Sequence, residues 1–132
     1  MPRDVFIQAF CDGSPIPMRA DAVRAVVEPF VVERAEGVAL IQTHDGGADL
    51  WGYGDDGGLA LVGATGMEIW DLVVAIAQVA GAVIIPMGGA PLVVDVLRIH
   101  DLPEETRAAA QLVTTGAELV LALQIGRDLP ED

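Results

Sequence analysis

The chain has 132 residues, 52% of them hydrophobic, which is typical of one globular domain with a core of its own. Its 20 aspartates and glutamates against 7 basic residues give a formal net charge of -13. Nucleic-acid binding and attraction to anionic membranes both need clustered basic side chains. The charge therefore excludes the first of these classes and disfavours the second, but it permits a basic protein partner.

Absent and rare residue types indicate the kind of genome and the cellular compartment to expect for the protein. Every basic residue is an arginine, and the chain contains no lysine and no asparagine. Because lysine and asparagine codons are AT-rich, this composition favours a high-GC bacterial genome. Cys11 is the only cysteine, so no disulfide within the chain is expected. The first residues lack a long apolar stretch and a small-residue cleavage site, so we expect no signal peptide and a cytoplasmic protein.

The apolar pattern predicts six strands, and a glycine-containing turn joins the second and third into a hairpin. The predicted strands span residues 5–10, 38–43, 48–53, 59–64, 83–85 and 111–114. Helices are expected from Asp21 to just before Pro29 and over residues 67–80, 103–110 and 117–125. Residues 92–100 fit either a strand with a short helix or a loop packed on the core.

These elements predict an α+β fold in one domain over residues 1–132. We expect a mixed α/β arrangement of about six strands and three to four helices, antiparallel in the first half and partly parallel in the second. Residues 72–97 are strongly apolar, but glycines and prolines interrupt them, which favours a buried helix and strand over a membrane span. The helix over 67–80 is apolar nearly all round and should be buried, with Trp70 in the core.

Two helix starts share the pattern Thr-Gly-x-Glu, beginning at Thr65 and at Thr115. A threonine followed three residues later by glutamate predicts a capping box at each helix. The glutamates, Glu68 and Glu118, would repel a phosphate there, so we expect structural caps and no phosphate site.

The inventory of catalytic groups is short. Without lysine there is no Schiff-base nucleophile, and no dinucleotide fingerprint follows the first strand, so no cofactor is expected. Ser14, the only serine, lies outside any nucleophile motif, and Asp12 beside Cys11 disfavours a reactive thiolate. We predict no catalytic residue and favour a protein that is not an enzyme.

Two His-Asp pairs, His44-Asp45 and His100-Asp101, offer ligands for a divalent metal. Both aspartates also suit structural roles, in the hairpin turn and before the helix that follows Pro103. The chain has no metal-binding spacing around either histidine, so we predict no metal site.

The hairpin region between residues 45 and 56 is both acidic and aromatic. If residues 48–53 form a strand, then Asp49, Trp51 and Tyr53 share one face. Tryptophan and tyrosine are enriched at interface hot spots, and acidic neighbours suit a basic partner. Alternatively, this face packs under a helix with its aromatic side chains in the core. The predicted partner-binding residues are Asp45, Asp49, Trp51, Tyr53, Asp55 and Asp56.

Two functions remain open on these grounds. The favoured one is a non-catalytic acidic interaction protein, for instance an immunity-type inhibitor of a basic toxin or nuclease. The alternative is a small enzyme or ligand-binding domain whose site uses carboxylates such as Asp12, Asp49 and Asp71. The apolar excess also allows a second copy of the chain as a partner.

Overall fold

A mixed sheet is the main element of the computed structural model, which describes residues 4–54 and 57–128, with side chains up to residue 123. Within those residues the sheet has nine strands; eight follow the order β3-β4-β5-β6-β1-β7-β8-β9, and β2 pairs with β1 outside this path. All pairs are antiparallel except β8 with β9, which is parallel. The predicted α+β class with a mixed sheet is confirmed, although the strands number nine and not about six. Their bounds are β1 (Val5–Cys11), β2 (Ser14–Ile16), β3 (Val31–Ala35), β4 (Val38–Gln42), β5 (Gly47–Trp51), β6 (Leu59–Thr65), β7 (Val83–Pro86), β8 (Leu92–Val93) and β9 (Gln111–Leu112).

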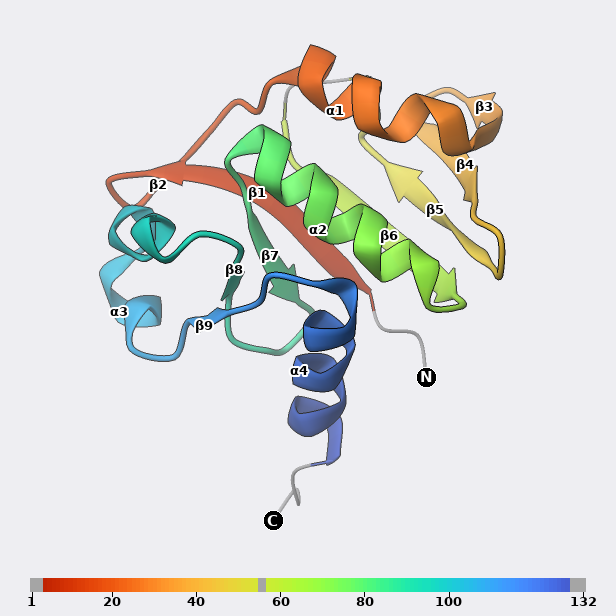
Figure 1. The fold of residues 1–132 in the computed structure, drawn as a ribbon. Coiled ribbons are helices and arrows are strands. Elements are labelled where there is room, and N and C mark those ends of the chain that lie inside the picture. Colours follow the sequence, from red (N-terminus) through yellow and green to blue (C-terminus); the bar gives the residue numbers. More distant parts are fainter. Residues whose placement is uncertain (1–3, 55–56, 129–132) are drawn as a thin grey trace.

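The longer helices cover one face of this sheet (Figure 1). They are α1 (Ala20–Val27), α2 (Glu68–Ala80) and α4 (Gly116–Asp128), and α2 packs between the other two. Shorter helical segments are η1 (Glu28–Phe30), η2 (Val96–Asp101) and α3 (Glu104–Arg107). Among the described residues, no helix is both long and apolar enough to cross a membrane.

The main core lies between the sheet and α2. Alternate residues of the strands point toward the helices, as Val5, Ile7 and Ala9 do in β1. The helix itself buries side chains around most of its circumference, as predicted, and Trp70 is only 2% exposed. Trp70 is therefore a core residue.

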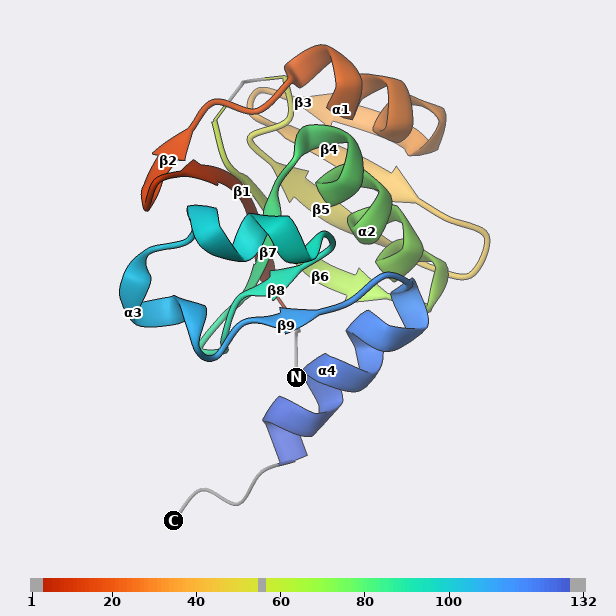
Figure 2. The ribbon, with the colours of Figure 1, turned by 60° about the vertical axis from the view of Figure 1, so that its left-hand side comes forward.

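A smaller core lies on the opposite face of the sheet, at the end nearest β8. Successive residues of a strand point to opposite faces, so the side chains of Val83 and Ile84 lie on opposite sides of the sheet. Val83 packs with Val93 and Leu102, while Ile84 belongs to the main core. The segment of η2 and α3 lies on this second side, across the sheet from α2 and α4 (Figure 2). The residues that the structure describes thus cover the second face at one end only.

Carboxylates from other elements cap two of the helices. Asp45, in the β4–β5 turn, accepts hydrogen bonds from the backbone amides of Met67 (2.8 Å) and Glu68 (3.2 Å) at the start of α2. The capping box predicted at Thr65 is wrong. The Thr65 hydroxyl instead accepts a hydrogen bond of 3.1 Å from the Gly47 amide. In the same way, the Asp71 carboxylate accepts a hydrogen bond of 3.0 Å from the Gly116 amide at the start of α4.

The second predicted box, at α4, is partly formed. The Thr115 hydroxyl accepts a hydrogen bond of 3.1 Å from the Glu118 amide, as a capping threonine should. The Glu118 carboxylate reaches back mainly to the amide and hydroxyl of Thr114, and the amide of Thr115 contributes less. These donations, first of all the one from the Thr114 amide, hold the pKa of Glu118 below its usual value.

Candidate interaction surface

One face of β4, β5, β6 and the first part of β1 carries outward side chains that the described helices do not cover. Strand register places these side chains in rows across the sheet. Trp51 is the Cα partner of both Val38 and Ala60, and Ala60 is in turn the partner of Phe6. In the neighbouring row, Asp49 lies between Leu40 and Val62.

Large apolar side chains on this face are exposed to solvent. Their exposed fractions are 43% for Phe6, 56% for Val32, 40% for Leu40 and 49% for Trp51. We call the outward side of the sheet that presents these four residues and Asp49 the open face. Large apolar side chains that are exposed on one face mark an interaction site more often than isolated exposed residues do.

The charges on the open face are acidic. Glu33 lies opposite Leu40 in register, and Asp49 lies on its other side. Arg34 points to the other face, where it pairs with Glu28, so the described strands place no arginine on the open face. The Asp49 side chain is half-buried and makes no hydrogen bond or ion pair with any residue that the structure describes.

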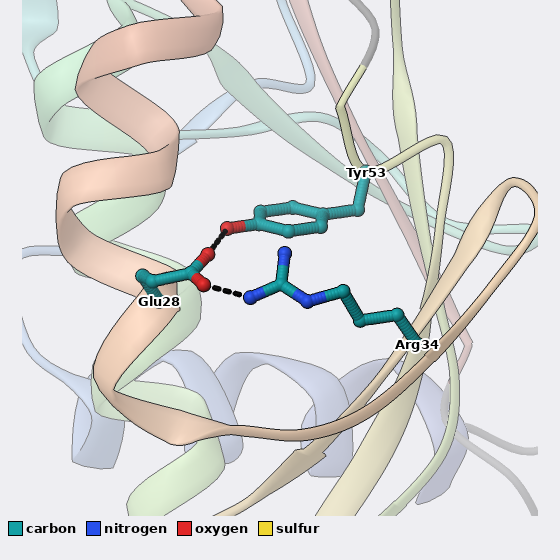
Figure 3. Close-up of polar contacts among 3 residues, drawn as sticks. All are labelled: Glu28, Arg34 and Tyr53. Atoms are coloured by element: carbon teal, nitrogen blue, oxygen red, sulfur yellow. Dashed lines mark hydrogen bonds and ion pairs between the residues drawn. The ribbon is translucent and has the colours of Figure 1, made fainter.

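Tyr53 does not share the face of Asp49 and Trp51, so that prediction is wrong. The strand ends at Trp51, and Gly52 turns the chain with a φ of 87°, a conformation that favours glycine. Tyr53 then packs against the main core, and its hydroxyl donates a hydrogen bond of 2.5 Å to Glu28 of η1 (Figure 3). Because the Glu28 carboxylate also binds Arg34, these three side chains hold the loop after β5 against η1 and β3.

The other predicted partner-binding residues have different positions. Asp45 caps α2, and the amides of Met67 and Glu68 hold its pKa below the usual value. Asp55 and Asp56 lie outside the described residues. Of the six predicted residues, Asp49 and Trp51 are the two that the structure places together on the open face.

A hollow of about 440 Å³ lies at the hairpin end of the open face. Val32 and Leu40 form its apolar wall, and Gln42, His44 and Thr65 contribute polar groups. Asp49 also lines it and is the only carboxylate among its described lining residues. The hollow therefore joins an apolar wall to an acidic group that has no partner in the described structure.

Sequence reasoning missed Phe6, Val32 and Leu40 as surface residues. The sequence does contain a signal for two of them, because Phe6 lies between Val5 and Ile7, and Leu40 between Ala39 and Ile41. A strand with only one buried face alternates apolar and polar residues, whereas an unbroken apolar run indicates that both faces are apolar. Val32 has no such signal, because it lies at a β-bulge between Val31 and Glu33.

The alternative chemical sites are not assembled. His44 lies in the β4–β5 turn and His100 in η2, toward opposite ends of the sheet (Figures 1 and 2). Asp12 lies in the β1–β2 turn and Asp71 on α2, so neither joins Asp49 on the open face.

The structure does bring Cys11, Asp12 and Asp101 together, with ligand atoms within 4.8 Å of one another. Two of the three residues are exposed, and the backbone amide of Gly13 holds the segments together by donating to the Asp101 carbonyl at 2.9 Å. Exposed acidic groups often gather in this way without an ion, so this cluster supports no metal assignment.

The open face thus combines exposed aromatic and aliphatic side chains, two carboxylates and a hollow beside one of them. Its exposed apolar side chains suit recognition of another molecule by contact. No family model, curated protein or solved structure matches the chain.

Proposed function

We propose that this chain is a non-catalytic interaction protein that binds a basic protein through the open face. The observation that carries the proposal is the solvent exposure of Trp51, at 49%, between Val38 and Ala60 on the open face. Tryptophan at the centre of an interface supplies a large contact area at low entropic cost and is among the residues most enriched at hot spots. An immunity-type role, and a bacterial and cytoplasmic setting, are part of this proposal.

Charge indicates the chemistry of the partner. Asp49 and Glu33 flank the apolar side chains, and the whole chain has a net charge of -13. A cationic surface would meet complementary charge at this face and would be steered toward it. A second copy of the chain would instead bring carboxylates against carboxylates, so we favour a basic partner over a homodimer at this face.

The experiment is a pull-down. It compares the proteins captured by three immobilised forms of this chain: wild type, W51A and L97A. Leu97 is 70% exposed in η2, away from the open face, so L97A controls for loss of an exposed apolar side chain. We expect wild type and L97A to retain the same cationic protein at low salt, and W51A to lose it. Purified partner should then bind wild type with an affinity that falls as salt concentration rises.

Two results would overturn the proposal. One is a partner that W51A binds as tightly as wild type does, since the open face would then not be the contact. The other is a set of captured proteins that are acidic, or whose binding is unaffected by salt. Identification of the captured protein by mass spectrometry decides the second point.

A further inference from the structure

We propose that the hollow beside Asp49 receives an arginine side chain of the partner. This inference rests on the proposed function and adds the chemical group that the open face recognises. The hollow has a volume of about 440 Å³, enough for one long side chain together with some water. It opens on the same face as Trp51, so an inserted side chain would belong to a contact centred on that residue.

The hollow is built into the backbone of the β4–β5 hairpin. At Gly46 and Gly47 the neighbouring strands approach so closely that an added Cβ would lie 2.1 Å from the Thr65 carbonyl oxygen and 2.3 Å from that of Ile41, respectively. The register between β5 and β6 also shifts between Gly47 and Asp49, which marks a bulge. Bulges re-aim neighbouring side chains, and this one lies next to Asp49. These backbone contacts fix the part of the hollow that Gly46 and Gly47 line.

The lining favours a cationic side chain. Asp49 is half-buried and has no hydrogen-bond or ion-pair partner among the described residues. A carboxylate partly removed from water and left unpaired costs free energy, and a guanidinium or ammonium group from outside would relieve that cost. His44 is the other titratable residue of the described lining, and no arginine of the described chain lines the hollow.

The neighbouring residues favour arginine over lysine. Trp51 lies two residues beyond Asp49 on the same face of β5, about 7 Å along the strand. A planar guanidinium can bind the carboxylate through two parallel hydrogen bonds and stack on a tryptophan ring. The lysine ammonium is more strongly hydrated and lacks this planar fork, so its transfer into a partly apolar hollow is less favourable.

The test uses capped tripeptides of leucine, arginine and leucine, with analogues that carry lysine or the uncharged isostere citrulline in the middle. Backbone amide shifts of the labelled protein are followed by NMR as each peptide is added. With the arginine peptide we expect saturable shifts at Leu40, Asp49 and Thr65, with a dissociation constant in the millimolar range. The citrulline peptide should bind at least about tenfold more weakly, because it lacks the charge that Asp49 pairs with.

Two variants distinguish binding in the hollow from attraction to the overall negative charge of the protein. D49N should weaken binding of the arginine peptide by about tenfold, whereas E33Q, which removes the same charge on the same face outside the lining, should weaken it by less than about threefold. An amide spectrum that matches the wild type away from residue 49 establishes that D49N is folded.

Three outcomes would overturn the inference: no saturable shift with the arginine peptide, equal binding of the lysine peptide, or equal losses in D49N and E33Q. None of these bears on the capture experiment with W51A. The open face can therefore prove to be an interface without an arginine site, and the two proposals fail independently.

Discussion

The two tryptophans of this chain have opposite environments. Trp70 is 2% exposed and lies on α2 within the main core, whereas Trp51 is 49% exposed at the end of β5. The difference arises from secondary structure. A helix buried around most of its circumference covers nearly every side chain, but a strand covers only the residues on its inner face.

Substitution of each tryptophan should distinguish the exposed residue from the core residue. W51A should lower the free energy of unfolding by about 1–2 kcal/mol, because Trp51 is 49% exposed and only part of its apolar surface is covered. W70A should lower it by about 3–5 kcal/mol, through lost burial and the cavity left behind. Urea denaturation followed by circular dichroism measures both changes, and W70F serves if W70A does not fold.

Fluorescence gives a second check on the same pair. In W70F the remaining indole is Trp51, and we expect red-shifted emission that acrylamide quenches efficiently. In W51F the remaining indole is Trp70, whose emission should be blue-shifted and protected. A protected Trp51 would remove it from the open face and, with it, the basis of the proposed contact.

At the scale of elements, the sequence predicts what local patterns determine. Strand β1, the β4–β5 hairpin and α2 all form near their predicted bounds, because alternation, turn glycines and helical periodicity are local signals. The edge strand β3 was missed because the bulge between Val31 and Glu33 interrupts its alternation. Strand β9 forms within the predicted span 111–114, and β8 followed by η2 matches one of the two alternatives that the sequence left open for residues 92–100.

The candidate site, too, could be predicted only where the signal in the sequence is local. Period two along β5 correctly placed Asp49 and Trp51 on one face, but it extended the strand to Tyr53, past the turn at Gly52. The hollow could not be predicted, because its wall at Val32 and its edge at Thr65 come from other strands. The cap on α2 was missed for the same reason, since Asp45 lies 22 residues before Met67.

Removal of the Asp45 cap should make the stability of α2 less dependent on pH. Hydrogen bonds, first from Met67, lower the pKa of Asp45 in the folded chain below its ordinary value of 3.8. The ionised form is therefore favoured by folding, so its contribution is fully present above that ordinary value and is lost as pH falls through the lower folded value. We expect the melting temperature of D45A to lie below that of wild type at pH 6, and the gap to narrow as pH falls below about 4.

Thermal melts between pH 6 and pH 2.5 measure this gap. The variant E36A removes one carboxylate from the exposed β3–β4 turn and corrects for the change in net charge. A gap between wild type and D45A that widens on acidification would have the wrong sign and would contradict the role of Asp45 as a cap.

At the scale of the whole molecule, the dominant feature is unbalanced negative charge. The formal net charge is -13, and in the described part of the chain only two ion pairs form, Glu28 with Arg34 and Arg98 with Asp101. Most carboxylates of the described residues therefore have no ion-pair partner among those residues. Their mutual repulsion destabilises the compact state relative to the unfolded chain, in which the charges lie farther apart.

Added salt should therefore stabilise the folded protein. The screening length falls from about 30 Å at 0.01 M to about 10 Å at 0.1 M, so repulsion across the sheet is strongly reduced over this range. We expect the melting temperature to rise by several degrees between 0.01 M and 0.3 M sodium chloride, most steeply at the low end. The double variant E36R/E105R, which brings the net charge four units closer to zero at two exposed positions, should melt higher at low salt and gain less from added salt. Equal gains in both proteins would mean that salt acts on apolar burial and not on charge, and the basic partner would then lose the electrostatic part of its support.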